Sequence, residues 1–337
     1  MKGSEGSMKQ LINSRGQIRQ QLLAGLTYTY NDTLTWQEKT GIVTKKTISK
    51  DKVVLISGGG CGHEPAHVGY IGENMLDCAV MGAIFEPPAS SEILQAIEQT
   101  YNGQGTLLII KNFEKDLASF LEAERLAKAK GLTVSHVIVD DDCSIESGTF
   151  EKRRRGVAGT VFVHKILGAA AAEGNSLDEL KTLGEQVIPL IKTLGVAFSP
   201  ASPIGVIPQQ YELAENEMYF GIGIHGEPGY RIETMQSSER IAVELVNKLK
   251  QQYERKELRK AAVLVNGLGG IPLLELSVFM NDVQQLLDIE DIDVVYKRMG
   301  NFLTAYNTNG LSLTLLTIKE DKWLDYLRIP TDAFGWK

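Results

Sequence analysis

From residue 52 onward the chain alternates short runs of aliphatic and β-branched residues with longer stretches whose apolar positions recur every three or four residues. The short runs predict strands, and the longer stretches predict helices between them. Parallel strands need such crossover helices, so this half of the chain predicts a three-layer α/β domain around a largely parallel sheet. The predicted strands cover 52–57, 78–85, 106–110 and 132–139, and the helices between them cover 90–100 and 115–130.

A proline-containing stretch without clear periodicity, near residues 195–210, predicts a domain boundary. Before it, further helices at 11–26, 160–174 and 176–194 complete a first domain of residues 8–195. After it, the pattern predicts a smaller α+β domain of residues 196–337. Its predicted strands cover 218–224, 261–266, 293–297 and 311–318, and its predicted helices cover 238–254 and 272–287.

The composition is that of a globular protein, with 43% hydrophobic and 23% charged residues. No apolar run approaches the ~18 residues that a membrane-spanning helix needs, so no membrane contact is expected. The net charge of -7 argues against direct nucleic-acid binding, which normally uses a basic surface. Three scattered cysteines fit a reducing cytoplasm, and residues 1–7 resemble a cloning remnant ahead of Met8.

The first predicted strand runs directly into a glycine-rich loop, GGGCGHEP, at residues 58–65. Four glycines in five positions exceed what a tight turn needs, and residues without side chains let backbone N–H groups approach a ligand. We therefore expect a ligand cradle here, with a helix beginning at Pro65. The GxxxxGK[ST] pattern of phosphate-binding loops occurs nowhere in the chain.

The same loop contains the H-E-x-x-H pattern of zinc proteases, formed by His63 and His67. That motif needs both histidines one turn apart within a helix. Pro65 belongs at a helix start, which leaves His63 in the loop before it. We therefore expect no metal at this position.

Polar residues also follow the strand predicted at 106–110. Lys111 supplies a hydrogen-bond donor, and Asp116 is either a cap of the next helix or a base beside the glycine loop. Ligands of open α/β sheets bind outside the carboxyl ends of the strands, where both residues fall. Position alone leaves the two roles of Asp116 open.

A run of three acids, residues 140–142, follows the next predicted strand. Clustered carboxylates suit Mg²⁺, but three adjacent side chains on an extended strand cannot all face one ion. Capping and turn formation are the favoured roles.

The second domain offers one histidine, His225, at a predicted strand end and between glycines in GIGIHGEPG, residues 221–229. A lone histidine is more often structural. The glycines, however, leave space around this ring, and His-Gly-Glu-Pro at residues 225–228 echoes the Gly-His-Glu-Pro of residues 62–65. A neutral imidazole is a competent nucleophile toward a ketone, which makes His225 a candidate for covalent ligand capture.

Together, six ordered blocks resemble the substrate-binding K subunit of dihydroxyacetone kinases (DhaK) across essentially the whole chain from Met8. The blocks are SGGGCGHEP at 57–65, IIKNFEKD at 109–116, VDDD at 139–142, RRGVAGTVFVHKILGAAA at 154–171, GIGIHGEPG at 221–229 and VNGLGGIPLLEL at 265–276.

The resemblance implies a homodimer that holds dihydroxyacetone as a hemiaminal on His225, without metal or cofactor. It implies that the ligand hydroxyls are held by Gly60, Cys61, Gly62, His63, Lys111 and Asp116. Covalent capture of a carbonyl would reject glycerol, which has no electrophilic carbon. In kinases of this family the nucleotide lies on a separate subunit or domain.

The chain departs from the family pattern in loops expected around the ligand. Glu114 and Lys115 replace Thr-Gly, and residues 85–90, 150–156 and 304–310 also differ. The ligand-binding residues are retained while the loops expected around them have changed, and this favours the non-catalytic DhaQ branch of the family. Members of that branch bind dihydroxyacetone and act as co-activators of a TetR-like transcription regulator. The alternative is a catalytic K subunit, in which Asp116, aided by His63, deprotonates the substrate hydroxyl for a phosphoryl donor on another subunit.

Overall fold

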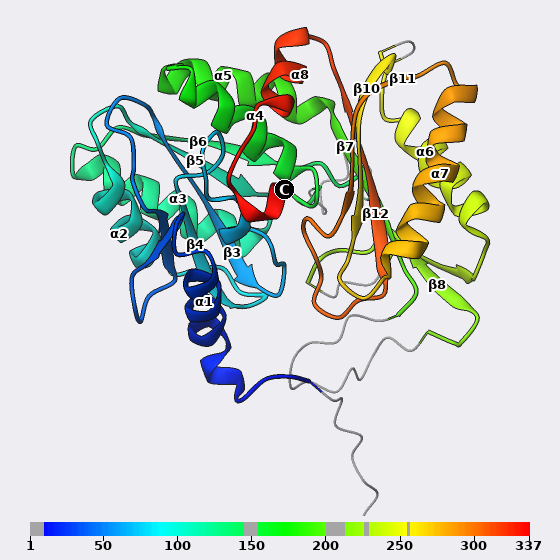
Figure 1. The fold of residues 1–337 in the computed structure, drawn as a ribbon, viewed down its shortest axis with the longest axis horizontal. Coiled ribbons are helices and arrows are strands. Elements are labelled where there is room, and N and C mark those ends of the chain that lie inside the picture. Colours follow the sequence, from blue (N-terminus) through cyan, green and yellow to red (C-terminus); the bar gives the residue numbers. More distant parts are fainter. Residues whose placement is uncertain (1–9, 145–153, 200–212, 226–228, 255–256) are drawn as a thin grey trace, which may run out of the picture.

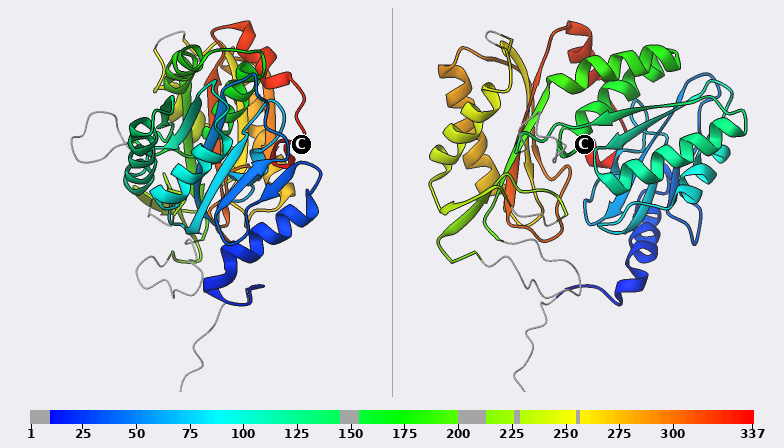
Figure 2. Two further views of the ribbon diagram at one scale, coloured as in Figure 1. Left: turned by 90° about the vertical axis from the view of Figure 1, so that its left-hand side faces the viewer. Right: turned by 180° about the vertical axis from the view of Figure 1, so that it is seen from behind.

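Two sheets with a shared helical layer between them organise the protein (Figure 1). The computed structural model describes residues 10–144, 154–199, 213–225, 229–254 and 257–337. Within these residues the strands form two sheets of six strands each. The sheets face each other across helix α4 (Thr160–Ala172), and further helices cover their outer faces (Figures 1 and 2).

The first sheet has the strand order β1-β2-β4-β3-β5-β6. Strands β4, β3, β5 and β6 run parallel to one another, while β1 and β2 join antiparallel at one edge. This confirms the predicted, largely parallel sheet. The strands are β1 (Leu34–Trp36), β2 (Ile42–Lys45), β3 (Val54–Cys61), β4 (Cys78–Ile84), β5 (Thr106–Lys111) and β6 (Val134–Val139).

Successive side chains of these parallel strands point to opposite faces, and both faces are buried. Ile56 and Leu108 pack against helices α2 (Ser90–Thr100) and α3 (Glu114–Ala129). Leu55 and Leu107 pack against α4 and α5 (Leu177–Val187). The predicted three-layer α/β arrangement is therefore confirmed.

The second sheet has the order β11-β10-β12-β7-β8-β9. Among its described pairs β10 and β11 are parallel and the others antiparallel, as an α+β architecture requires. Helices α6 (Ser238–Lys250) and α7 (Leu273–Ile289) cover its outer face. The strands are β7 (Ile191–Ala197), β8 (Glu217–Phe220), β9 (Arg231–Thr234), β10 (Lys260–Gly267), β11 (Asp293–Gly300) and β12 (Gly310–Thr317).

The end of the chain packs back against the first sheet. Helix α8 (Asp321–Arg328) contacts α4, and Tyr326 donates a hydrogen bond to Glu173. Beyond it, Phe334 stacks on Tyr30, which follows helix α1 (Ile18–Thr29), with ring centroids 3.9 Å apart. No helix in the described ranges is both long and apolar enough to cross a membrane.

One predicted helix is wrong over its last turns. The helix expected at 176–194 ends at Val187, and a 3-10 turn (Ile188–Leu190) leads into strand β7. The capping box between Ser176 and Glu179 is present as predicted. Pro189 cannot continue a helical hydrogen-bond ladder, and the residues after it pair with β12 instead.

Candidate functional site

Three neighbouring parallel strands bring the predicted site residues of the first sheet together. Strand β3 lies between β4 and β5, so the carboxyl ends of all three meet at one edge. The loop predicted at residues 58–65 is wrong over its first part, because residues 58–61 extend β3. Gly62 and His63 follow the strand, and Lys111 is the last residue of β5. Asp116 lies in the first turn of α3, which begins three residues after Lys111.

The glycine loop is shaped by contact with Phe85, the residue after β4. A Cβ on Gly60 would lie 2.8 Å from the Phe85 backbone, and one on Gly62 would lie 2.7 Å from its ring. Gly62 also has φ +102°, which side-chain-bearing residues rarely adopt. Its N–H donates to the Glu64 carboxylate at 3.0 Å. This loop therefore requires glycine for both space and conformation.

Cys61, between these glycines, is fully buried. Its Sγ lies 3.2 Å from the carbonyl oxygen of Gly82, to which it donates. Burial raises the pKa of the thiol to about 12, so Cys61 stays protonated and is no nucleophile at neutral pH.

His63 is fully buried and bonded to a loop of the second sheet. Its Nδ1 lies 2.8 Å from the carbonyl oxygen of Thr304, in the connection between β11 and β12. Burial lowers the pKa of His63 well below its ordinary value, and the nearby charges of Lys111 and His225 lower it further. The ring is therefore neutral at physiological pH.

The helix expected to begin at Pro65 does not form. Turns lead instead to a 3-10 helix (Val68–Tyr70). The carbonyl of Glu64, which would be the first that a helix uses, accepts a hydrogen bond from the Thr304 hydroxyl, and those of Gly62 and His63 accept from the N–H groups of Tyr306 and Thr304. A tertiary contact has replaced the local helix.

His67 faces away from His63 toward a different partner. Its Nδ1 lies 2.9 Å from Nε2 of His164 on α4, and both rings are fully buried. Among the described residues, no group of three or more His, Cys, Asp or Glu side chains is arranged to hold a metal ion. The H-E-x-x-H pattern here is not the helical motif of a zinc protease.

Lys111 and Asp116 converge on Gly59. A Cβ at Gly59 would lie 2.8 Å from Nζ of Lys111 and 3.5 Å from Oδ1 of Asp116. Both side chains are buried. The N-cap of α3 is Phe113, and no side chain caps this helix, so the capping role considered for Asp116 is wrong. Burial raises the pKa of Asp116, while the charges of Lys111 and His225 oppose that rise.

His225 reaches this edge from the second sheet, after strand β8. Its ring lies edge-on to His63, with centroids 4.8 Å apart, and edge-on to Phe113 at 4.3 Å. Phe85 lies 5.8 Å away. Residues far apart in sequence thus surround one point: His63 and Lys111 with Asp116 from the first sheet, and His225 from the second. The residues after His225, 226–228, lie outside the described part.

Two aromatic residues of this site, Phe85 and Phe113, were not predicted to contact His225. The feature of the sequence that could have indicated them is their position. Phe85 directly follows β4, and Phe113 lies two residues beyond β5. Rings at such positions can pack against whatever binds at the strand ends.

The acidic run has the predicted structural role. Asp141 accepts the N–H groups of Val157 and Gly159, each at 2.8 Å, just before α4. Asp142 pairs with Nε of Arg155 at 2.6 Å. These two carboxylates are occupied with backbone and arginine donors, which confirms the turn and capping interpretation for Asp141 and Asp142.

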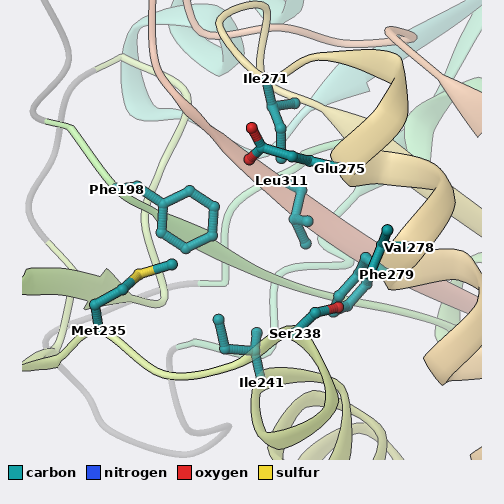
Figure 3. Close-up of a pocket in the computed structure, with 9 residues that line it drawn as sticks. All are labelled: Phe198, Met235, Ser238, Ile241, Ile271, Glu275, Val278, Phe279 and Leu311. Atoms are coloured by element: carbon teal, nitrogen blue, oxygen red, sulfur yellow. The ribbon is translucent and has the colours of Figure 1, made fainter.

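A separate pocket of about 140 Å³ lies on the outer side of the second sheet, between the beginnings of α6 and α7 (Figure 3). It contains none of the predicted site residues. Most of its lining is apolar, with one carboxylate, and comprises Phe198, Met235, Ser238, Ile241, Ile271, Glu275, Val278, Phe279 and Leu311.

The fold and the strand-end cluster place the chain in a known family. Residues 24–335 match the Dak1 domain family, and the chain belongs to it.

Two relatives show which branches of this family the chain resembles. Over nearly its whole length the chain is 49% identical to the DhaKLM operon coactivator DhaQ of Lactococcus lactis, covering 96% of this chain and 99% of that protein. It is 44% identical to the dihydroxyacetone-binding subunit DhaK of the PTS-dependent dihydroxyacetone kinase of the same organism, with 98% and 99% covered.

Solved structures of related proteins have the same fold as this chain. The dihydroxyacetone kinase operon co-activator DhaQ superposes with a TM-score of 0.89 at 48% identity, covering 94% of this chain and 98% of that one. The dihydroxyacetone kinase of C. freundii gives 0.87 at 31% identity, where this chain spans 60% of that protein.

Proposed function

We propose that this protein binds dihydroxyacetone as a covalent adduct on His225 and, once loaded, acts as a co-activator of a transcription regulator. The observation that carries the proposal is the meeting of His225 with His63, Lys111 and Asp116 at one strand edge, in a chain similar to DhaQ over its full length. No metal or cofactor is required for this chemistry.

The adduct forms by addition to the ketone. A ring nitrogen of His225 that carries a lone pair attacks C2, and the carbonyl π electrons move to oxygen. That oxygen takes up one proton, and the other ring nitrogen of His225 releases one, so the hemiaminal has the composition of protein plus ligand. Phe85 and Phe113 pack edge-on against the imidazole of His225.

The ligand's hydroxyl groups need polar partners in this buried position. Lys111 offers N–H donors, and Asp116 and neutral His63 offer acceptors. The loop residues Gly60, Cys61 and Gly62 supply backbone atoms at the same edge. A ketone flanked by hydroxyls satisfies both kinds of partner, whereas glycerol lacks the carbon that His225 attacks.

A catalytic K subunit is the second candidate, favoured by the 44% identity to a DhaK subunit. In that role Asp116 and His63 would deprotonate the ligand hydroxyl for a donor on another subunit. The changed residues around the site favour the co-activator role instead. Glu114 and Lys115 are exposed at the first turn of α3, next to Phe113, where a nucleotide-carrying subunit would approach. Of the altered segment 150–156, residues 150–153 lie outside the described part.

We propose two protein partners, a second copy of this chain and a TetR-like regulator. Ligand can control regulator binding only if the loaded and empty forms differ in affinity for it. Tagged protein, with and without dihydroxyacetone, should be mixed with a purified TetR-like regulator and its operator DNA. We expect regulator retention with ligand only, and none with His225→Ala. Equal retention by the loaded protein and by this variant would refute the co-activator role.

A further inference from the structure

The hydrogen-bond partner of His63 determines which ring nitrogen carries its proton. Nδ1 lies 2.8 Å from the Thr304 carbonyl oxygen, and a carbonyl has no hydrogen to donate. Nδ1 must therefore be the donor. Because burial keeps the ring neutral, it carries a single N–H, and Nε2 is left with a lone pair.

Nε2 of His63 is buried and has no hydrogen-bond partner among the described residues. The His63 ring lies beside the His225 ring, with the two ring centroids 4.8 Å apart. We therefore assign the lone pair on Nε2 of His63 to the ligand site. A buried acceptor left without a donor is unfavourable, and a hydroxyl of a bound ligand would supply the missing donor.

The Thr304 carbonyl is held in place by a residue of the second sheet that does not touch the ligand site. Asn266, near the end of β10, is fully buried. Its Oδ1 accepts the N–H groups of Phe302 and Leu303 at 2.8 and 3.0 Å, and its Nδ2 donates to the Leu303 carbonyl at 2.9 Å. These bonds fix the loop immediately before Thr304.

The same loop is joined to the glycine loop at a second point. The Thr304 hydroxyl donates to the Glu64 carbonyl at 2.9 Å, and the Thr304 N–H donates to the His63 carbonyl at 3.2 Å. The Thr304 carbonyl is thus held from both sides, by Asn266 on one sheet and by the glycine loop on the other.

We propose that Asn266 is a positioning residue which, through the Thr304 carbonyl, holds His63 in the Nδ1–H tautomer, so that Nε2 accepts a hydrogen bond from a ligand hydroxyl. The identity of that ligand rests on the proposed function. The site should therefore discriminate between ketones by their hydroxyl groups: dihydroxyacetone can donate to His63, and acetone cannot.

The tautomer can be measured without any ligand. In protein labelled with ¹⁵N-histidine, the ring-nitrogen resonances of His63 are identified by their loss in His63→Gln. We expect a neutral ring with the proton on Nδ1 at neutral pH. A proton on Nε2, or on both nitrogens, overturns the proposal. Because no ligand is present, this outcome is independent of whether His225 forms an adduct.

The role of Asn266 is tested by two variants. Asn266→Leu keeps the size and removes all the loop bonds, so His63 should populate both tautomers and dihydroxyacetone affinity should fall about tenfold, the equivalent of one hydrogen bond. Asn266→Asp keeps the acceptor for Phe302 and Leu303 and should restore the single tautomer and most of the affinity. If Asn266→Leu fails to fold, the wild-type tautomer still tests the proposal, because a proton on Nε2 overturns it.

Thr304→Val is the matched control, since it removes the hydroxyl bonds of that residue and keeps its carbonyl. It should change the His63 tautomer less than Asn266→Leu does, because the Thr304 N–H still donates to the His63 carbonyl. An unchanged tautomer in folded Asn266→Leu, or a tautomer change in Thr304→Val as large as in Asn266→Leu, contradicts the assignment to Asn266.

Discussion

The rings of His63 and His225 meet edge-on, with centroids 4.8 Å apart, although one follows a strand of the first sheet and the other a strand of the second. Neither sheet alone contains the site. The Thr304 loop adds direct hydrogen bonds across the same boundary. A ligand bound at this point, as we propose, would bridge both sheets and could change how the two halves present themselves to a partner.

Gly59→Ala should weaken ligand binding without unfolding the protein. The new Cβ would lie 2.8 Å from Nζ of Lys111, so the amine must move away from Asp116. Loss of a hydrogen bond from a charged donor predicts an affinity at least about tenfold lower, measured by calorimetry with dihydroxyacetone.

Gly25→Ala, within α1 and with no atom near the added Cβ, is the control and should bind normally. Unchanged affinity in Gly59→Ala would mean that Lys111 does not bind the ligand from its position over Gly59.

Replacing His164 should flatten the pH dependence of stability. Burial lowers the pKa of His164 to about 3, against an ordinary value near 6.5. Between these values the unfolded chain binds more protons, so the free energy of unfolding falls as the pH falls, by at most about 1.4 kcal/mol per pH unit. His164→Gln removes this contribution while keeping a hydrogen-bonding side chain for His67.

Urea unfolding of wild type and His164→Gln at about pH 6, 5 and 4 tests this. The wild type should lose more stability than the variant over this range, because contributions from other groups cancel in the difference. Equal losses, with equal dependence on urea, would mean that His164 is protonated in the folded protein.

The rim residues should determine whether the protein supports phosphoryl transfer. Mixed with a DhaK-family nucleotide-binding subunit, its phosphoryl donor and dihydroxyacetone, the unmodified protein should form little phosphorylated product. Even a ~1 Å misplacement can cost ~100-fold in such reactions. The double variant Glu114→Thr, Lys115→Gly should raise the rate measurably without changing ligand affinity. Turnover of the unmodified protein at about 1–100 per second would establish the catalytic role instead.

The sequence was sufficient to predict what depends on local pattern and on strand ends. Lys111 and Asp116 were expected near the glycine loop because parallel strands share one carboxyl edge, and the structure places them together at Gly59. The sequence could not reveal the hydrogen bonds from the Thr304 loop, which replaced the helix expected at Pro65. Those contacts join segments far apart in the chain, and no local periodicity encodes them.

The error after Val187 has a related cause. A short apolar stretch fits a buried helix and a buried strand equally well, and pairing with β12 decides between them. The aromatic contacts of His225 likewise depend on the packing of one sheet on the other.

The state of C2 in bound dihydroxyacetone tests the central claim most directly. Protein labelled with ¹⁵N-histidine should be mixed with [2-¹³C]dihydroxyacetone and examined by NMR. We predict that C2 leaves the ketone region and shows a one-bond coupling to a histidine nitrogen, which the free hydrate cannot show, and that His225→Ala loses this signal. Bound ligand with an intact ketone carbon, or the same coupling in His225→Ala, would contradict covalent capture by His225.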